Sequence, residues 1–471
     1  MVAAEIGTQR VAVWGLGREG RAAIRFLRQR HPSLPLLVLD DGYGPPPDGL
    51  GSGIEYAFGV DRIAGALAHI DIIVKSPGVS LYRHEIQAAR ATGTQITSLL
   101  NLWFAERLDL TTICVTGTKG KSTTASLIAH MLAGLGRRVA LVGNIGIPIT
   151  AIDNATADIA VIEVSSYQAA DFDGVCDIAV LTSLYPEHID WHLSVENYYR
   201  DKINLLNHSR RRIIHRAAAE IFERFATGPP ARQDFFEHER GIHCCSTEIL
   251  DDAAAIGQVR NPYLARPHNR SNLCAALTVA KSLNLDPTAA LEAVSGFRGL
   301  PHRQQELGEI GGVLFVDDSI STIPESTLAA LAVYAGRDIT VILGGHDRGI
   351  DYGKLVEKAV TGAAKAVICL GDGGERIYSL ARAAATRRDD VACKIHRAQS
   401  MGDAVAFARQ VTPPGGVVLL SPAAPSYGHY RDYIERGRDF ASKAGLPAPE
   451  EVHRYPVRNG CHQQRKGTLG R

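Results

Sequence analysis

The stretch Ile113-Cys-Val-Thr-Gly-Thr-Lys-Gly-Lys-Ser-Thr123 decides the fold of the middle of this chain. Its first four residues are typical of a buried strand, and a helical pattern rich in Ala and Leu runs from Thr124 to Leu135. A glycine loop between strand and helix predicts a phosphate-binding loop, because its N–H groups and the helix N-terminus attract phosphate oxygens. Lys121 is then placed to reach terminal phosphates and Ser122 to bind Mg²⁺.

One departure and one alternative accompany this loop. The spacing from Gly117 to Gly120 is two residues shorter than in GxxxxGK[ST]. The alternative is a glycine turn that only starts a helix. The strand and helix on either side favour the phosphate loop.

Two acidic segments follow the loop. In Val161-Ile-Glu163-Val-Ser-Ser166 a carboxylate ends an apolar strand, which is costly unless it is paired or metal-bound. Glu163 is therefore a candidate Mg²⁺ ligand, with a structural salt bridge as the alternative. The segment Glu187 to His192 follows the next strand. If it is extended, its alternate residues His188, Asp190 and His192 converge on one face, although a hydrogen-bonded loop is the alternative.

The N-terminal region carries a second glycine loop. Gly15-Leu-Gly17-Arg-Glu-Gly20 follows the predicted strand Val11–Trp14, and Asp40 and Asp41 end another strand about twenty residues later. The pattern is that of a dinucleotide fingerprint, but by itself it indicates only a helix N-terminus open to a diphosphate. Ser76 follows a strand at the same predicted edge.

Apolar β-branched runs alternate with helical patterns, which predicts α/β architecture with parallel sheets. A length of 471 residues suggests about three domains. The expected strands are Val11–Trp14, Leu36–Leu39, Ile72–Lys75, Thr112–Thr116, Ala140–Val142, Ile159–Val164, Ile178–Leu184, Val313–Val316, Ile339–Leu343, Ala366–Leu370 and Gly416–Leu420. Residues 207–261 are expected to form edge strands and loops. The domains are predicted at 1–107, 108–298 and 299–453, with seams near Ala105–Leu110 and Phe297–Arg303 and a polar tail at 454–471.

Composition narrows the function classes. Lys and Arg number 51 against 50 Asp and Glu, so the net charge of +1 disfavours nucleic acid and membrane surfaces as partners. No apolar run approaches the roughly 20 residues of a membrane-spanning helix. The first ten residues do not have the pattern of a signal peptide, and the eight cysteines form no CxxC pair. A cytoplasmic enzyme is expected.

Three strands of the last third end in polar segments. These are Asp317-Asp318-Ser319, Gly344-Gly345-His346-Asp347-Arg348 and Ser421-Pro-Ala-Ala-Pro-Ser426. Ligands of open α/β sheets bind at the carboxyl ends of the strands, so these segments are candidates to hold a small charged substrate. Arg348 is the natural clamp for a carboxylate. Taken singly, each segment is equally well an ordinary strand-to-helix turn.

In this order the motifs resemble the Mur ligase family, ATP-dependent amide ligases of peptidoglycan precursor synthesis. The resemblance spans about Val11 to Leu446. It rests on the loop from Thr116, Gly143-Asn-Ile-Gly146, Glu163-Val-Ser-Ser-Tyr-Gln168, Glu187-His188-x-Asp190, Tyr199-Arg-Asp-Lys202, His268-Asn269-x-x-Asn272, Gly299-Leu-Pro-His-Arg303, Asp318-Ser319 and Gly344-Gly345. The GxGxxG start, Ser76-Pro-Gly78 and Ser421-Pro-Ala…Arg436-Gly-x-x-Phe440 resemble the branch that adds glutamate to UDP-N-acetylmuramoyl-L-alanine.

The resemblance implies three domains, each with its own ligand, in a monomeric enzyme. A Rossmann-like first domain would bind the UDP of the precursor, not NAD, through Gly15, Gly17, Gly20, Asp40, Asp41 and Ser76. The central P-loop domain would bind ATP and two Mg²⁺ ions. A Rossmann-like third domain would bring in glutamate through Thr322, Arg348, Ser426 and Tyr427.

Further roles come from the same resemblance. ATP would be contacted by Gly117, Thr118, Lys119, Gly120, Lys121, Ser122, Thr123, Asn269, Asn272, Arg303 and Asp318. Ser122 and Glu163 would hold one metal, and His188 with a carbamylated Lys202 the second. Asn144 and Gln168 would face the muramoyl substrate. Lys121, His188 and Lys202 would be the catalytic residues for an acyl-phosphate intermediate attacked by the amine of glutamate.

Departures from the family pattern concern the amino acid. Ligases that add D-glutamate typically read Asp-Ser-Lys-Ala-Thr-Asn, whereas this chain reads Asp318-Ser-Ile320-Ser-Thr-Ile323. Replacing a cation beside a dianionic substrate by isoleucine is not neutral. Pro425-Ser-Tyr-Gly428 also stands where Ala-Ser-Leu is usual. The resemblance therefore favours the variant branch that adds L-glutamate, with D-glutamate as the alternative.

Three other classes compete with this interpretation. An NAD-dependent dehydrogenase would explain Gly15 to Gly20 but not the phosphate loop. A folylpolyglutamate synthase would not need the roughly 105 residues before Leu110. A non-catalytic ATP-binding switch would not need a third domain with carboxylate-binding loops. Phosphate release that depends on the UDP precursor and an amino acid would separate all four.

Overall fold

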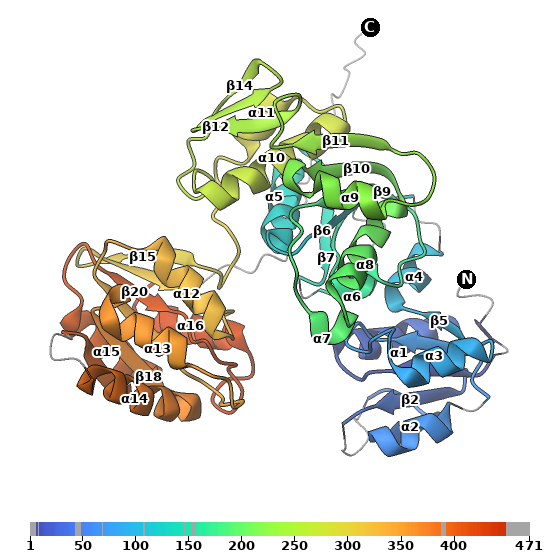
Figure 1. Cartoon of the computed structure of the whole chain (residues 1–471), viewed down its shortest axis with the longest axis horizontal. Helices are drawn as coiled ribbons and strands as arrows, with labels where there is room; N and C mark the ends of the chain where they lie inside the picture. The colour runs from blue at the N-terminus through green and yellow to red at the C-terminus, as the bar shows by residue number, and fades with distance from the viewer. Residues whose placement is uncertain are drawn as a thin grey trace, which may run out of the picture. The chain divides into compact units, whose positions relative to one another are not determined.

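The structure, a computed structural model, describes residues 6–7, 9–42, 49–67, 69–106, 109–145, 147–152, 157–387 and 392–448 (Figure 1). The predicted tail at 454–471 and Gly146 lie outside these residues. The chain divides into two compact units, the first extending to Phe297 and the second beginning at Arg298.

The first unit begins with a parallel sheet in the doubly wound order β3-β2-β1-β4-β5. Its strands are β1 (Val11–Trp14), β2 (Leu36–Asp40), β3 (Ile54–Phe58), β4 (Ile72–Lys75) and β5 (Gln95–Thr97). The helices α1 (Arg18–Arg30), α2 (Val60–Ala66) and α3 (His84–Ala91) connect them. Because the strand order reverses between β1 and β4, the loops after these two strands border the crevice where such sheets bind ligands.

A second parallel sheet follows in the same unit, in the order β11-β10-β9-β6-β8-β7. Its strands are β6 (Thr111–Thr116), β7 (Val139–Gly143), β8 (Ile159–Glu163), β9 (Cys176–Leu181), β10 (Ser209–His215) and β11 (Arg232–Phe236). The helices are α5 (Lys121–Gly134), α6 (Ser166–Ala169), α7 (Ile189–His192), α8 (Val195–Asn207), α9 (Ala219–Phe225), α10 (Pro267–Ser282) and α11 (Pro287–Ala293). A small antiparallel sheet adds β12 (Ile242–Cys245), β13 (Glu248–Asp251) and β14 (Ala254–Gln258).

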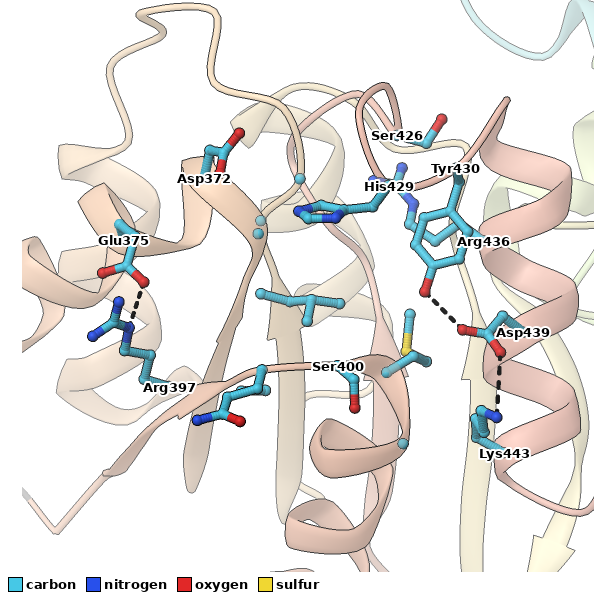
Figure 2. A pocket seen from close by; sticks show the side chains of 18 residues that line it. Asp372, Glu375, Arg397, Ser400, Ser426, His429, Tyr430, Arg436, Asp439 and Lys443 are labelled. Carbon is cyan, nitrogen blue, oxygen red and sulfur yellow. Dashed lines mark hydrogen bonds and ion pairs between the residues drawn. The ribbon is translucent and has the colours of Figure 1, made fainter.

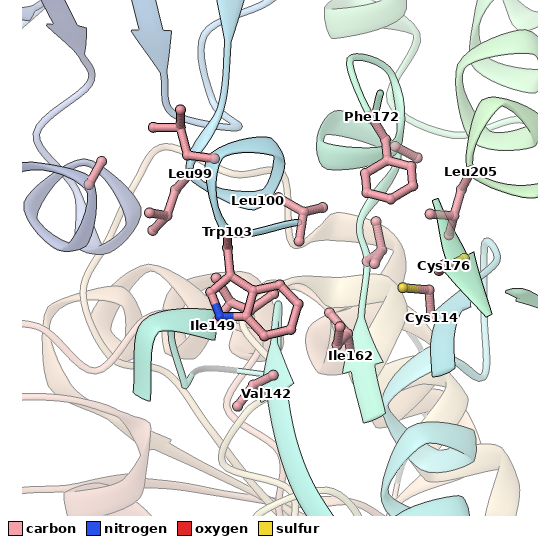
Figure 3. Packing of buried hydrophobic residues seen from close by; sticks show 14 of the residues in the cluster. Leu99, Leu100, Trp103, Cys114, Val142, Ile149, Ile162, Phe172, Cys176 and Leu205 are labelled. Atoms are coloured by element: carbon pink, nitrogen blue, oxygen red, sulfur yellow. The ribbon is translucent and has the colours of Figure 1, made fainter. Parts of the chain in front are cut away.

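The two large sheets of this unit share one hydrophobic core (Figure 3). The short helix α4 (Leu99–Phe104) joins them, and it starts at Ser98, whose hydroxyl accepts the N–H of Asn101. Leu99, Leu100 and Trp103 of α4 pack in the same cluster as Val142 and Ile162 of the central sheet. The contact ties the N-terminal sheet to the central one.

The second unit is a six-stranded sheet in the order β15-β16-β20-β17-β18-β19, in which only β15 is antiparallel. Its strands are β15 (Gln305–Ile310), β16 (Val313–Asp317), β17 (Ile339–Leu343), β18 (Ala366–Leu370), β19 (Lys394–Ala398) and β20 (Val417–Leu420). Residues of α12 (Pro324–Val333), α13 (Gly353–Lys358) and α14 (Gly371–Thr386) share one core cluster. Residues of α15 (Met401–Val411) and α16 (Tyr433–Lys443) share another.

The predicted α/β class with largely parallel sheets is confirmed. The strand expected at Ile178–Leu184 ends at Leu181, and residues 182–188 form no strand or helix. The expectation of edge strands and loops at 207–261 was partly wrong, because this stretch also contains the helix α9 and the strand β10, which lies inside the sheet. The edge strand β11 agrees with the expectation. Among the described residues, no helix combines the length and apolar character needed to cross a bilayer.

Candidate active site

The loop between β6 and α5 packs against the chain that follows β9. Gly117 has φ 145° and Gly120 φ 87°, conformations that favour glycine. A Cβ on Gly117 would lie 2.0 Å from Thr182 Oγ1, and one on Gly120 would lie 2.6 Å from Asn272 Oδ1. The N–H of Thr118 donates to the carbonyl of Ser183 at 2.9 Å. A side chain at Gly117 or Gly120 would therefore collide with its neighbours, which explains why both positions are glycine.

Two lysines donate to the same loop carbonyl. Lys121 Nζ lies 2.9 Å from Gly117 O and 3.0 Å from Thr118 O, and Lys202 Nζ lies 3.0 Å from Gly117 O. Lys202 is only 1% exposed. Burial, and then the Lys121 cation, hold the pKa of the Lys202 amine well below its usual range. The neutral amine of Lys202 therefore forms more readily than that of an exposed lysine.

Glu163 ends β8, the neighbour of β6, and register places it opposite Val115. Asn144 Nδ2 donates to Glu163 Oε1 at 2.9 Å. Glu163 Oε2 is buried and has no hydrogen-bond partner among the described residues. An unsatisfied carboxylate oxygen is costly in a protein interior. Glu163 and the Ser122 hydroxyl two positions after Gly120 are oxygen donors of the kind Mg²⁺ prefers, so these residues fit a magnesium ion.

The segment after β9 contributes Glu187 and His188. Lys119 Nζ lies 2.5 Å from Glu187 Oε1, and His188 Nε2 lies 3.8 Å from Glu187 Oε2. Burial lowers the pKa of His188 although Glu187 opposes this shift. Near neutral pH the imidazole is therefore favoured in its neutral form, which is the form that binds metals.

The predicted convergence of His188, Asp190 and His192 is wrong. The segment is not extended, because Ile189–His192 form the helical turn α7, in which alternate residues point to different sides. His192 is fully buried and bonds to Asp201 and Ser166. In the part of the chain that the structure describes, no three His, Cys, Asp or Glu residues form a metal-binding group.

The N-terminal glycine loop is braced by its own domain. Asp40 Oδ2 accepts the N–H of Leu16 at 2.6 Å, and Ser76 Oγ donates to Gly15 O at 2.8 Å. A Cβ on Gly20 would lie 1.8 Å from Gly15 O, which accounts for the third glycine of the motif. Asp41 forms an ion pair with Arg83. The structure thus brings Asp40, at the end of β2, and Ser76, after β4, against the loop that contains Gly15, Gly17 and Gly20.

The side-chain amides that were predicted to contact the substrate or ATP form hydrogen bonds with other residues of the protein. Gln168 forms a capping box with Ser165, and its Nε2 donates to Glu19 at 3.2 Å. Asn272 accepts the Thr124 hydroxyl at 3.1 Å and donates to Asn269 Oδ1 at 3.3 Å. Asn272 therefore lies against the phosphate loop, and Asn269 lies behind it.

In the second unit, Asp318 lies at the carboxyl end of the sheet. It accepts the hydroxyls of Ser321 and Ser421 at 2.7 and 2.6 Å and the N–H of Gln304 at 3.1 Å. Burial raises the pKa of Asp318 to about 6 against the lowering effect of these hydrogen bonds. Arg303 Nε is buried with no hydrogen-bond partner among the described residues.

The candidate amino-acid residues differ in exposure. Arg348 is exposed and its Nη2 donates to Thr322 O at 3.3 Å. Ser426 is buried, whereas Tyr427 is 62% exposed. Ser426 also lines a cavity of ≈ 830 Å³ at the carboxyl ends of β17, β18 and β19 (Figure 2).

Two buried polar residues were quoted in motifs of the sequence but given no role. Arg436 is 1% exposed and donates to Ser319 and to the Ala424 carbonyl, and burial lowers its pKa to about 10. Asp201 is the second such residue. A usable signal was present in α8, where Tyr198, Asp201, Lys202 and Leu205 recur at helical spacing and form a buried stripe. Two charged residues on such a stripe indicate a function or a buried partner.

Comparison with known proteins matches all three regions. Residues 9–98 match the description "Mur ligase MurD-like, N-terminal domain", 115–280 "Mur ligase middle domain" and 302–424 "Mur ligase, glutamate ligase domain". The chain is 39% identical over 447 residues to the UDP-N-acetylmuramoyl-L-alanine--L-glutamate ligase of Xanthomonas axonopodis pv. citri, covering 93% of this chain and 95% of that protein. It is 39% identical over 459 residues to the protein of the same name in Salinispora tropica, covering 92% and 96%.

Solved structures support the fold. UDP-N-acetylmuramate-alanine ligase from Thermotoga maritima matches with a TM-score of 0.55 at 18% identity, covering 93% of this chain and 99% of the other. A Mur ligase structure from Acinetobacter baumannii, the UDP-N-acetylmuramoylalanyl-D-glutamyl-2,6-diaminopimelate--D-alanyl-D-alanyl ligase, matches with a TM-score of 0.53 at 16% identity, covering 88% and 86%. With these matches added to the geometry of the phosphate loop, the chain belongs to the Mur ligase family.

Proposed function

We propose that this chain is an ATP-dependent ligase that adds L-glutamate to UDP-N-acetylmuramoyl-L-alanine. The relatives at 39% identity carry that name. Two geometric observations support the proposal. Lys121 and Lys202 donate to the same carbonyl of the phosphate loop, and Glu163 Oε2 is buried with no hydrogen-bond partner among the described residues. This arrangement suits a phosphoryl group and a divalent cation, and it serves no evident purpose in a dehydrogenase.

Each region is proposed to serve one reactant. Residues 1–107 bind the UDP precursor at the β1–β4 crevice. Residues 108–298 bind ATP and Mg²⁺, and residues 299–453 bind glutamate. The enzyme is proposed to act as a monomer in the cytoplasm.

Two Mg²⁺ ions are proposed. Ser122 and Glu163 would hold one, and His188 and Lys202 the other, where the ions would neutralise charge on the transferring phosphoryl group. An ammonium at Lys202 would repel a metal, so Lys202 is proposed to be carbamylated. Its neutral amine nitrogen forms a bond to the carbon of CO₂ and one proton leaves, which turns a cation into an anionic ligand. The depressed pKa of Lys202 supports this step.

The reaction begins by activating a poor acyl donor. The alanyl carboxylate attacks the γ-phosphorus of ATP and ADP leaves, giving an acyl phosphate. The Lys121 ammonium is placed to stabilise the charge that develops on the transferred group. The free amine of glutamate then attacks the acyl carbon, phosphate leaves, and a proton is lost from nitrogen as the amide forms. Asn144, which donates a hydrogen bond to Glu163 Oε1, is proposed to orient this carboxylate.

Residues of the second unit favour L-glutamate over D-glutamate. Ile320 and Ile323 stand where D-glutamate ligases have lysine and asparagine, and Ile323 is 42% exposed. Arg348 is left as an anchor for one carboxylate, with Thr322, Ser426 and Tyr427 as candidate donors. Inverting the α-carbon while the amine stays in line must move the carboxylate or the side chain, so one pocket cannot keep every contact with both enantiomers.

The test is steady-state ADP formation with purified UDP-N-acetylmuramoyl-L-alanine and each glutamate enantiomer. We expect kcat/KM for L-glutamate to exceed that for D-glutamate by a factor that can reach ~10⁴. A better rate with D-glutamate would overturn the stereochemical assignment alone. No ADP formation with either enantiomer, but turnover with another amino acid, would overturn the glutamate assignment.

A further inference from the structure

The segment 75–82 begins at the end of β4 in the N-terminal sheet and contacts the helical turn α7 of the central domain. Trp191 Nε1 donates to Pro77 O at 3.1 Å, and Ser80 Oγ donates to Trp191 O at 2.8 Å. Trp191 is thus held at both its indole and its backbone. The segment includes Ser76 and Pro77, which lie at the proposed UDP crevice.

A buried ion pair fixes the start of the same segment. Lys75 Nζ lies 3.1 Å from Asp171 Oδ2, with 1% and 4% of the two side chains exposed. Asp171 follows α6 in the central domain, so this pair also joins the two domains. Separating the two side chains would leave each charge buried without a partner, which is costly. The segment is therefore expected to move little.

A chain of hydrogen bonds runs from the end of the segment into the active-site region. Tyr82 Oη donates to Asp201 at 3.0 and 3.1 Å from its two oxygens. Asp201 Oδ2 lies 2.6 Å from His192 Nδ1, and His192 Nε2 lies 3.0 Å from Ser166 Oγ. His192 and Ser166 are buried, and Asp201 is only 7% exposed.

The donors in this chain follow from the chemistry of the groups. Burial and the Asp201 carboxylate raise the pKa of Tyr82, so its hydroxyl keeps its proton and donates. A carboxylate only accepts, so His192 Nδ1 carries a proton toward it. In a neutral imidazole Nε2 then accepts from the Ser166 hydroxyl. Every member has a partner, and such fully satisfied networks hold a single geometry.

The chain ends beside the proposed catalytic groups. Asp201 directly precedes Lys202, and His192 closes the helical turn that starts after His188. His188 and Leu193, which flank this turn, have φ values of 56° and 65°, unusual for non-glycine residues. Such conformations persist when the surroundings over-determine them. The contacts of Trp191 and His192 with the neighbouring elements fix the turn between His188 and Leu193.

We propose that Tyr82, Asp201 and His192 are positioning residues that align Lys202 and His188 with the precursor-binding segment 75–82. The inference rests on the proposed roles of Lys202 and His188. Through these contacts, binding of the UDP moiety far from the reacting carboxylate sets the geometry at which phosphoryl transfer occurs. The binding energy of the UDP moiety is then used to raise kcat. This is expected when a part of the substrate distant from the reacting group accelerates the chemical step and does not only increase affinity.

The main test is Tyr82→Phe, which removes one hydroxyl and keeps the ring. We expect kcat with the full UDP precursor to fall at least tenfold, while KM for ATP and Kd for UDP measured by calorimetry stay within twofold. Tyr352→Phe is the matched control, since Tyr352 is buried in the second unit and its hydroxyl has no hydrogen-bond partner among the described residues. Its kcat should equal that of the unaltered enzyme.

A truncated substrate separates positioning from simple stability. N-acetylmuramoyl-L-alanine has the reacting carboxylate but no UDP, so its slow turnover should be the same in the unaltered enzyme and in Tyr82→Phe. Equal losses on both substrates, an unchanged kcat on the full precursor, or a loss of UDP affinity in proportion to kcat would each overturn the proposal.

His192 offers an independent check. Asparagine can place a donor near the position of Nδ1, so His192→Asn should keep more of kcat than His192→Ala at equal Tm. Equal kcat in these two variants would also overturn the proposal. Absence of ligase activity in the unaltered enzyme is a different outcome, because it contradicts the proposed function and is seen before any variant is made.

Discussion

The two glycine loops of the first unit have the same local design and opposite chemistry. Each follows a parallel strand and opens a helix, so each presents backbone N–H groups and a positive helix end to phosphate. The loop after β1 is braced by Asp40 and Ser76, which hold its backbone. The loop after β6 carries Lys121 and receives Lys202 on the same carbonyl. The braces suit a loop that only holds a diphosphate, whereas the two lysine side chains suit a loop at which a phosphoryl group is transferred.

The largest effect is expected from Lys121→Ala. Loss of a preorganised cation beside a transferring phosphoryl group should lower kcat by about 10³-fold or more, with the fold intact. The measurement is ADP formation together with circular dichroism. Lys365→Ala, at an exposed pair with Asp338, is the control and should be fully active. Near-normal turnover by folded Lys121→Ala would remove the chemical distinction between the loops.

Lys202→Ala should also be inactive, for a different reason. An anionic ligand would be missing, so formate or acetate should restore part of the activity by occupying the vacated space. The same acids should not rescue Lys121→Ala, in which a cation is missing. Equal rescue of the two variants, or an unmodified ammonium at Lys202 in a crystal with nucleotide and metal, would contradict the proposed carbamate.

A moderate effect is expected at the braced loop. Asp40→Ala removes the acceptor of the Leu16 N–H, which should raise KM for the UDP precursor about tenfold. The values of kcat and of KM for ATP should change less than twofold. Asp158→Ala, at an exposed pair with Arg138, serves as the control. A fall in kcat at unchanged KM would show that this loop does more than hold its ligand.

The last effect concerns the folding stability of the second unit and not catalysis, and it is a dependence on pH. Asp318 has a pKa near 3.8 when unfolded and about 6 when folded, so the folded state binds its proton more tightly. The free energy of unfolding should therefore fall as pH rises from about 4 to 6, by about 3 kcal/mol from this group. Denaturant titrations of the unaltered protein and Asp318→Asn test this. A stability difference that is independent of pH would contradict it.

The two glycine loops and several strands could be predicted from the sequence, whereas the surroundings of the buried residues could not. Both loops were predicted because glycines between a strand and a helix have few other uses, and Val11–Trp14 and Ile339–Leu343 were predicted residue for residue. The small sheet β12–β14 lacks an apolar run, so pattern alone did not locate its strands. The burial of His192 was missed because a short helical turn replaced an extended segment. Lys202 was assigned only by resemblance, since its surroundings come from elements distant in the chain.

The strand order of the second unit has a consequence for biosynthesis. β20 lies between β16 and β17, although it is the last of the described strands to be made. Until Val417–Leu420 have left the ribosome, β16 and β17 lack the neighbour that joins them, and their buried apolar side chains face water. Pairings over such long sequence separations form slowly. The unit is thus exposed to aggregation and proteolysis for most of its synthesis, and a chain that stops before β20 has a gap inside its sheet and not a shortened edge.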